Sequence, residues 1–242
     1  RRLQEMGVES DFIRIERGIS RINLKLKSID GTEINGAGPD ISPERVEELM
    51  EKLDSLKEGD VLFLAGSIPA SMPDDMYERI MKRLEGRGVM TVVDATKDLL
   101  VKVLKYHPFL VKPNNHELGE IFGVELKTRE DVVPYGKKLQ EMGAENVLIS
   151  MAGEGAVLIA ANGQVYKKPV PTGTLVNGVG AGDSMVAGFM AGWMEKRDYR
   201  HAFYMGIAAG SASAFSENLA TGKEVEAVYR QVAGQKQEGE NI

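Results

Sequence analysis

Short apolar runs alternate with longer amphipathic segments through the middle of the chain. The clearest run is Val61–Ala65, and similar runs follow at 90–94, 109–112 and 146–150. Apolar runs of this length are typical of strands buried on both faces, and the periodic segments between them are typical of helices. Strands that alternate with helices predict an α/β fold of three layers, with a mainly parallel central sheet between two layers of helices.

The predicted helices have recognisable starts. Ser42-Pro43-Glu44 combines a capping hydroxyl, a proline at the first helical position and an acid in the first turn. The first residues resemble the last turns of a helix that ends at Gly7. Further helices are expected at 74–84, 97–105 and 130–142, and two long ones from near Ala181 and Tyr199.

Residues 19–36 are predicted to form a β-hairpin. Polar and apolar side chains alternate along 21–27, so Arg21 and Lys25 share one face while Ile22 and Leu24 share the other. Asp30-Gly31 is a strong turn signal. From the residues alone, the cationic face is better explained as a solvated hairpin edge than as a binding surface. A second antiparallel pair is expected in 155–171, around Asn162-Gly163.

Charge and composition exclude several classes of function. The net charge of −6 argues against a nucleic-acid partner, which needs clustered Lys and Arg. The longest apolar stretch, 185–194, is too short to cross a membrane and contains glycines, so no membrane association is expected. The sequence has no cysteine, which excludes disulfides and thiolate sites and fits a cytoplasmic protein.

Polar residues follow the predicted strands at the ends where parallel sheets bind ligands. Gly66-Ser67, Asp94, Lys112-Pro113-Asn114 and Ser150 each come at or just after the end of an apolar run. In open α/β sheets, ligands collect at the carboxyl ends of the strands. We therefore expect a binding site at this edge.

The glycine-rich segment 176–188 is the strongest candidate for chemistry. Gly180-Ala181-Gly182 precedes Asp183 at an expected helix start. Free backbone N–H groups and the helix dipole favour phosphate oxygens there, and an adjacent aspartate can accept a proton from a hydroxyl. A closely packed helix start capped by an aspartate explains the same residues about equally well, because short glycine motifs give many false positives.

With its flanks, this segment resembles the second signature of the ribokinase-like (PfkB-type) sugar kinases. Lys112–Glu117 resembles the Asn-x-x-Glu element of that family, and 150–156 resembles its nucleotide loop. Segments 20–25, 32–35, 38–41 and 66–69 resemble the 1-phosphofructokinase branch. The similarity covers nearly the whole chain in order, and implies a kinase domain of residues 1–18 and 37–242 with residues 19–36 as a β-lid.

The resemblance also implies a role for each matching residue. Asp183 would be the catalytic base, with the backbone of Gly180, Ala181 and Gly182 as the anion hole. Glu117 and Asn114 would orient Mg²⁺ through water. The nucleotide would contact Lys112, Asn114, Glu117, Ser150, Gly153, Gly155 and Asn218, and the phosphosugar would contact Arg21, Lys25 and Ser67. From the residues alone, Glu117 is equally well explained as an acid in the first turn of a helix. The glycines of 150–155 are equally well explained as a simple turn between two strands.

The implied reaction is transfer of the ATP γ-phosphate to a ketohexose phosphate, with fructose 1-phosphate giving fructose 1,6-bisphosphate. Tagatose-6-phosphate kinase is the alternative within enzymes, and a non-catalytic phosphosugar or nucleotide sensor is the alternative outside them. The expected cofactors are ATP and Mg²⁺. A homodimer through the β-lid is expected, because Ile22, Leu24 and Leu26 form an apolar face that needs a cover.

Three departures from the family pattern bear on activity. The family's first strand and its glycine-rich sugar loop are expected to precede Arg1, so we expect weak or no turnover from a chain that begins there. Gly178 stands where the family usually has Ser or Thr. Ala152 stands where the nucleotide loop usually has Gly, and is expected to restrict a backbone conformation that glycine adopts freely.

Overall fold

The structure is a computed structural model that describes residues 2–25 and 33–234. The chain divides into two compact units. The first comprises residues 1–60 and 67–89, and the second comprises residues 61–66 and 90–242. The predicted division into residues 1–18 with 37–242 and a lid at 19–36 stays a prediction.

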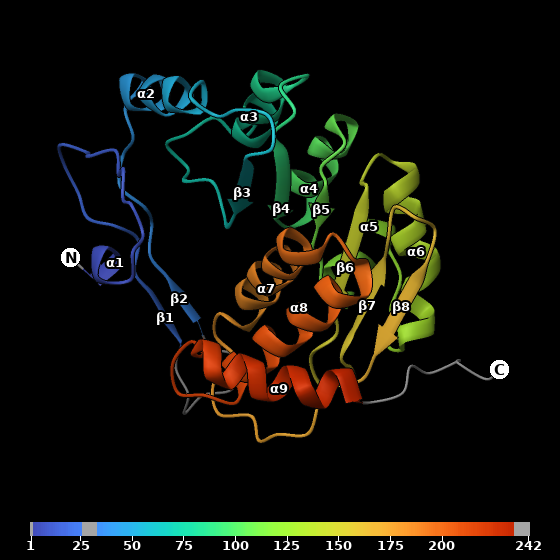
Figure 1. Ribbon diagram of the computed structural model, residues 1–242. Coiled ribbons are helices and arrows are strands. Elements are labelled where there is room, and N and C mark those ends of the chain that lie inside the picture. The colour runs from blue at the N-terminus through green and yellow to red at the C-terminus, as the bar shows by residue number, and fades with distance from the viewer. Residues whose placement is uncertain (1, 26–32, 235–242) are drawn as a thin grey trace. The chain divides into compact units, whose positions relative to one another are not determined.

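The second unit is built on a six-stranded sheet, seen near the centre of Figure 1. Its strands, in spatial order, are β3 (Val61–Ala65), β4 (Met90–Asp94), β5 (Leu110–Val111), β6 (Asn146–Ser150), β7 (Ala156–Ile159) and β8 (Val165–Lys168). The first four are parallel, while β7 and β8 pair antiparallel to their neighbours. The mainly parallel sheet predicted from the apolar runs is confirmed, and so is the antiparallel pair in 155–171.

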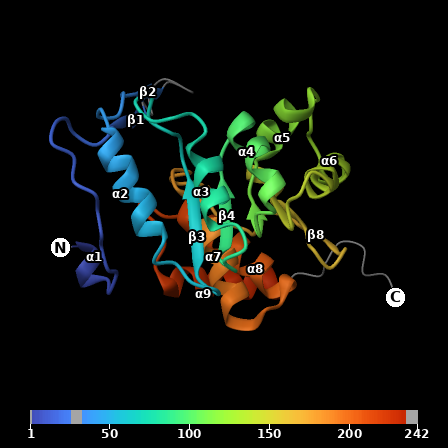
Figure 2. The same cartoon turned by 90° about the horizontal axis from the view of Figure 1, so that it is seen from above.

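Helices cover both faces of this sheet, as Figure 2 shows from above. One layer contains α4 (Lys97–Val103), the 3₁₀ turn η1 (Leu104–Tyr106), α5 (Asn115–Phe122) and α6 (Arg129–Glu141). The other contains α7 (Ala181–Lys196), α8 (Tyr199–Ala214) and α9 (Gly222–Gly234). The three-layer α/β architecture is therefore confirmed.

Alternate residues of the strands supply the two halves of the core. Leu148 and Leu158 belong to the buried cluster that includes Phe189 of α7 and Phe203 of α8. Their neighbours point to the other face, where a Cβ built on Gly136 of α6 would lie 2.8 Å from Ile159. This period of two is the geometry of a β-strand, and it explains why the central strands read as continuous apolar runs.

The described part of the first unit contains the β-hairpin strands and three helices. β1 (Asn23–Lys25) and β2 (Glu33–Asn35) pair antiparallel, with Leu24 opposite Ile34. The predicted turn at Asp30-Gly31 lies outside the described residues. The helices are α1 (Arg2–Glu5), α2 (Pro43–Leu53) and α3 (Met76–Leu84).

An arginine pair connects the end of α2 to α3 within the first unit. Arg83 donates to both carboxylate oxygens of Asp54, at 2.8 and 2.5 Å. Arg87 donates to the carbonyl oxygens of Asp54 and Leu56, at 2.6 and 2.9 Å. These bonds satisfy carbonyl groups that a helix end leaves without intrahelical partners.

Three details differ from the sequence predictions. β3 is not buried on both faces, since 46% of Phe63 is exposed, and it is the edge strand among the described strands of its sheet. Ser42 precedes α2 but its side chain makes no capping hydrogen bond. Helices α5 and α9 were not predicted. Within the described residues, no helix is both long and apolar enough to span a membrane.

The closest helix packing in the second unit lies between α7 and α8. A Cβ built on Gly188 would lie 2.6 Å from the Ala209 Cβ and 2.6 Å from the Met205 carbonyl oxygen. Real atoms cannot approach so closely, so this position has no room for a side chain.

We therefore expect Gly188→Val to lower the free energy of unfolding by about 1–3 kcal/mol, since overpacking forces the helices apart. The matched control is Ala187→Val, the adjacent and exposed position of the same helix, which should change it by only about 0.5 kcal/mol. Thermal unfolding followed by circular dichroism measures both. Equal losses in the two variants would contradict this packing argument.

Candidate active site

The polar residues predicted at the carboxyl ends of the strands meet at one edge of the sheet. Lys112, just after β5, places its Nζ 3.1 Å from Oδ1 of Asp94 at the end of β4. Ser150, at the end of β6, donates its backbone N–H to the Pro113 carbonyl at 3.1 Å. Asn114 and Ser150 form a further parallel bridge. The neighbouring strands therefore bring these groups together, as expected.

The glycine-rich segment forms the start of α7 beside this edge. Gly180 is the N-cap residue with φ of +79°, a left-handed conformation that favours glycine. The Ser184 N–H bonds back to the Gly180 carbonyl at 2.9 Å. Within the described residues, the N–H groups of Gly182 and Asp183 have no hydrogen-bond acceptor. They are available to an anion.

Lys112 adds a positive charge to this helix start. A Cβ built on Gly182 would lie 3.4 Å from the Lys112 Nζ, so the ammonium group lies directly against the first turn of α7. Only 8% of the lysine side chain is exposed. An ammonium group beside free N–H groups and a helix N-terminus makes a local site for phosphate oxygens.

The Asp183 carboxylate is exposed at the first turn of α7 and has no hydrogen bond or ion pair with any described residue. It is therefore free to accept a proton. Burial raises the pKa of the Asp94 carboxyl above its ordinary value, and the negative charges of Asp183 and Glu117 raise it further, while Lys112 lowers it. The charges of Asp183 and Glu117 thus act on Asp94, which also pairs with Lys112.

Asn114 and Glu117 form a capping box at the start of α5. The Glu117 N–H donates to the Asn114 side chain, and the Asn114 N–H donates to Oε2 of Glu117, both at 2.8 Å. This reciprocal pair fixes both side chains and leaves Oε1 of Glu117 without a hydrogen bond among the described residues.

No group of three or more His, Cys, Asp or Glu among the described residues could hold a metal ion alone. A Mg²⁺ ion usually keeps several waters and binds one or two carboxylates together with phosphate oxygens. The free oxygen of Glu117 suits this mode, and the site therefore fits a Mg²⁺ ion that is held partly through water.

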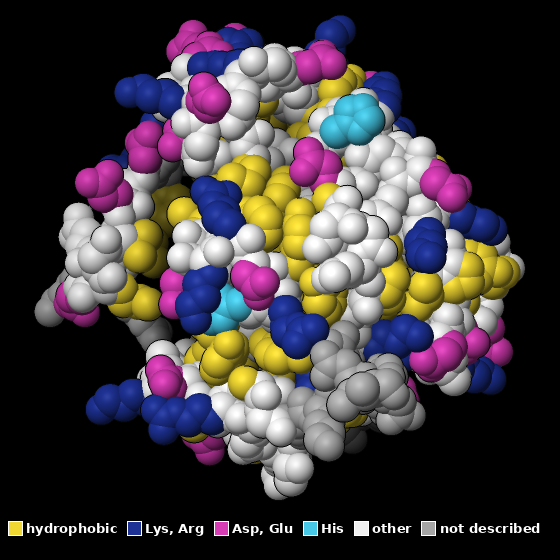
Figure 3. Space-filling model, turned by 45° about the vertical axis from the view of Figure 1, so that its right-hand side comes forward, with side chains coloured by type: hydrophobic (Ala, Val, Ile, Leu, Met, Phe, Trp, Pro, Cys, Tyr) yellow, Lys and Arg dark blue, Asp and Glu magenta, His cyan; other side chains and the backbone are white. Residues whose placement is uncertain are grey.

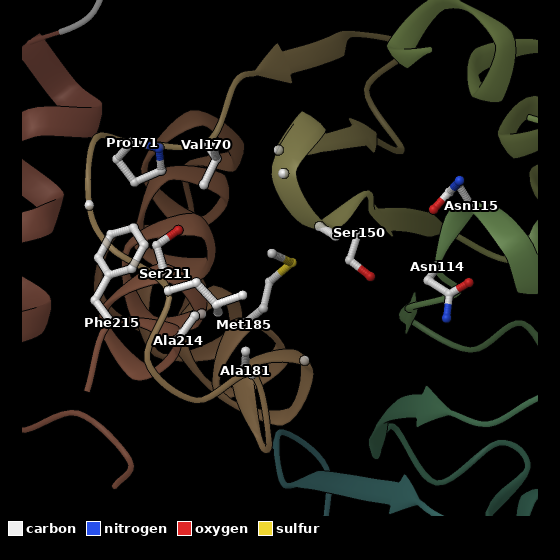
Figure 4. Close-up of a pocket in the computed structure, with 18 of the residues that line it drawn as sticks. Asn114, Asn115, Ser150, Val170, Pro171, Ala181, Met185, Ser211, Ala214 and Phe215 are labelled. Carbon is white, nitrogen blue, oxygen red and sulfur yellow. The ribbon is translucent and has the colours of Figure 1, made fainter. Parts of the chain in front are cut away.

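A cavity of about 580 Å³ opens beside the helix start. In Figure 4, Val170, Pro171 and Phe215 lie on one side and Ser150 and Asn114 on the other. The lining comprises Asn114, Asn115, His116, Ser150, Ala152, Gly153, Gly155, Val170, Pro171, Gly173, Leu175, Gly178, Ala181, Gly182, Met185, Gly210, Ser211, Ala214 and Phe215. A volume of this size with an apolar end and a polar end suits a nucleotide-sized ligand.

The turn 151–155, which we call the nucleotide turn, forms part of the cavity wall and contains the 3₁₀ turn η2 (Ala152–Glu154). A Cβ on Gly155 would lie 2.1 Å from the Lys168 carbonyl oxygen, and its φ is +91°, so only glycine fits there. Ala152 has φ of +45°, which confirms that an alanine occupies a backbone conformation suited to glycine.

The structure does not bring every predicted site residue to the cavity. Asn218 lies in an exposed segment after α8 and is not among the lining residues. Arg21 and Ser67 belong to the first unit, where Arg21 Nη1 donates to Ser67 Oγ at 2.6 Å. Lys25 is the last residue of β1 in the same unit.

Sequence reasoning missed the apolar wall of the cavity. The sequence analysis gives no role to Met185 or Phe215, and both line the cavity. A phenylalanine just after the last turn of α8 is the one signal that could have suggested it. On the face in Figure 3, acidic and basic side chains are interspersed.

The chain is similar in sequence to several known proteins. Residues 1–226 match the model of the pfkB family carbohydrate kinases. The chain is 49% identical over 230 residues to 1-phosphofructokinase of Bacillus subtilis, which covers 95% of this chain and 75% of that protein. It is 36% identical over 217 residues to D-tagatose-1-phosphate kinase of Bacillus licheniformis, covering 88% and 69%.

Solved structures show the same fold. A crystal structure of a Staphylococcus aureus protein has 38% identity and a TM-score of 0.84, covering 95% of this chain and 74% of the other. Phosphofructokinase-2 of Escherichia coli in complex with potassium has 21% identity and a TM-score of 0.84, covering 96% and 76%. The latter likeness concerns the fold alone.

We expect Ala152→Gly to raise the free energy of unfolding by about 0.5–1 kcal/mol, because glycine adopts a positive φ without steric cost. Ala152→Val should lower it, because a β-branched side chain is strained there. The thermal midpoints of the two variants and the wild type measure this. A valine variant as stable as the wild type would show that the turn carries no strain.

Proposed function

Because the chain belongs to the pfkB family of carbohydrate kinases, we propose that it phosphorylates a ketohexose phosphate at its free primary hydroxyl with ATP. The proposed acceptor is fructose 1-phosphate and the product is fructose 1,6-bisphosphate. One observation carries the proposal: the exposed Asp183 carboxylate lies on the same helix turn as free N–H groups, beside the buried ammonium of Lys112.

In this reaction the hydroxyl oxygen of the sugar forms a bond to the γ-phosphorus as the bond to the bridging oxygen of ADP breaks. Asp183 accepts the proton that the hydroxyl loses. We assign the anion hole for the oxygens of the moving group, whose charge is spread over three oxygens in the transition state, to the backbone of Gly180, Ala181 and Gly182. Of these residues, Gly182 has an N–H group that is free within the described part of the chain, while the Ala181 N–H donates to the Gly178 carbonyl at 3.3 Å. Catalysis of this kind depends mainly on positioning and on charge.

The charges around the helix start suit two anionic substrates. Lys112 offsets part of the phosphate charge, and Asp94 holds its ammonium group in place at 3.1 Å. Mg²⁺, oriented through water by Glu117 and Asn114, would neutralise further charge on the nucleotide phosphates. The capping box keeps both side chains in one orientation for that purpose.

We assign the cavity to the nucleotide. Ser150, Gly153 and Gly155 line its polar side, and Phe215, with Val170, Pro171 and Met185, supplies apolar contacts for the base. A role for Asn218 near the adenine stays a prediction.

We assign Arg21, Lys25 and Ser67 of the first unit to the phosphosugar. The hydrogen bond from Arg21 to Ser67 holds the guanidinium group in one orientation, which favours recognition of a phosphate. Ile22, just before β1, Leu24 of β1 and Ile34 of β2 are exposed, which supports the proposed homodimer through the hairpin, while Leu26 lies outside the described residues. A cytoplasmic location also stays a prediction.

A tagatose phosphate is the second candidate acceptor, favoured by the 36% identity to D-tagatose-1-phosphate kinase. A sensor without catalysis is the remaining alternative, but the exposed Asp183 argues against it, since a protein that only binds does not need a base. The two experiments that follow separate these possibilities.

Asp183→Asn should lower kcat by roughly 10²–10⁴-fold, because general base catalysis contributes that much, while nucleotide binding is retained. The matched control is Asp98→Asn, which removes an exposed acid from the first turn of α4 and should leave kcat at the wild-type value. A coupled assay for ADP and calorimetry with an ATP analogue measure the two effects. A fully active Asp183→Asn would refute the assigned base.

Fructose 1-phosphate should give a higher kcat/KM than tagatose 1-phosphate or tagatose 6-phosphate, since substrate discrimination is expressed in this ratio. Initial rates with each sugar phosphate at saturating ATP measure it. A higher ratio for either tagatose phosphate would reassign the acceptor. Binding without a bisphosphate product from any of the three would support the sensor.

A further inference from the structure

The nucleotide turn needs support from outside itself. It is held internally by backbone hydrogen bonds from Met151 to Gly155 and from Glu154 to Met151, both at 2.9 Å. Residues 152–154 are exposed, and Ala152 has the unfavourable φ of +45°. A strained backbone conformation persists only where the surrounding structure holds it, so the shape of this cavity wall depends on contacts beyond the turn's own hydrogen bonds.

Arg129, the first residue of α6, makes that external contact. Its Nη1 donates to the main-chain carbonyl of Glu154 at 2.5 Å and lies 3.7 Å from the Glu154 carboxylate. The arginine side chain is only 14% exposed, while that of Glu154 is 63% exposed. A largely buried guanidinium group thus bonds directly to the backbone of the nucleotide turn.

The helix itself does not require an arginine at this position. Thr128 and Asp131 already form a capping box, with the Thr128 N–H donating to Asp131 at 2.8 Å. A cation in the first turn is opposed by the helix dipole, which favours the acids Glu130 and Asp131. The contact with the turn therefore explains Arg129 better than helix stability does.

We propose that Arg129 is a positioning residue for the nucleotide: its hydrogen bond to the Glu154 carbonyl fixes the turn against which the nucleotide binds. The inference rests on the proposed function for the identity of the ligand. In this proposal Arg129 does not contact either substrate. Its loss is expected to weaken nucleotide binding and to leave binding of the sugar phosphate unchanged.

Arg129→Met keeps the length and apolar part of the side chain but removes the donor. We expect the Kd for a non-hydrolysable ATP analogue with Mg²⁺, measured by calorimetry on the whole chain, to rise about tenfold, since hydrogen bonds to charged groups are among the stronger ones. The KM for ATP should rise in parallel, while kcat and the KM for the sugar phosphate should change little.

Three further variants separate the positioning role from a structural one. Arg129→Lys keeps a cationic donor and should give an intermediate Kd. Glu154→Gln removes only the exposed carboxylate and keeps the carbonyl, so it should affect the Kd far less than Arg129→Met. The matched control is Lys167→Met, which breaks the 2.9 Å ion pair with Glu130, the next residue of α6, and should leave the Kd at the wild-type value.

Equal Kd values for the wild type and Arg129→Met would overturn the inference and leave the proposed kinase activity intact. An equal rise in the KM values of both substrates would also overturn it, because that pattern indicates a general structural loss. If Arg129→Met does not fold, Arg129→Lys and Glu154→Gln still decide the question. A wild-type chain that binds no ATP analogue would instead contradict the proposed function itself.

Discussion

The buried ammonium group of Lys112 is the interaction on which the candidate active site depends. It pairs with Asp94 at 3.1 Å and lies against Gly182 in the first turn of α7. A charge with 8% of its side chain exposed is costly unless it is compensated. Asp94 compensates it within the protein, and phosphate oxygens would do so in the complex. One lysine therefore links the sheet edge to the glycine-rich helix start.

The pKa of the Asp94 carboxyl is affected by the same concentration of charged groups. Burial raises its pKa, and the carboxylates of Asp183 and Glu117 add to that effect. Without a ligand this region is therefore rich in negative charge and has one buried cation. A Mg²⁺ ion bound there, as proposed, would offset part of this negative charge and favour phosphorylated substrates on a chain with a net charge of −6.

Much of the fold could be predicted from the sequence, because strands buried on both faces leave a simple pattern. Val61–Ala65, 90–94 and 146–150 match β3, β4 and β6 residue for residue. Helix α5 is not among the helices predicted by range: the resemblance assigns its start, Asn114–Glu117, to binding, and a helix start there is only the alternative explanation of Glu117. The exposure of Phe63 could not be predicted, since an apolar run does not distinguish an edge strand from a central one.

The candidate site was predicted less completely. The motifs in the sequence do indicate the sterically constrained glycines, such as Gly155 and Gly180. They also indicate the strained backbone at Ala152. The apolar cavity wall and the Arg129 contact are formed by side chains from separate elements. The spacing of these residues along the sequence does not indicate that they are close together in the fold. The hydrophobic periodicity of a helix indicates which of its faces is buried, but not which residues of other elements contact that face.

The capping box at α5 has a consequence for how this protein can vary. The two side chains proposed to orient the metal also satisfy the first N–H groups of a helix, so losing either one costs helix stability. If they also hold the ion, the same loss lowers metal affinity. A replacement at this pair that preserves both properties has to cap the helix and bind the ion with one side chain.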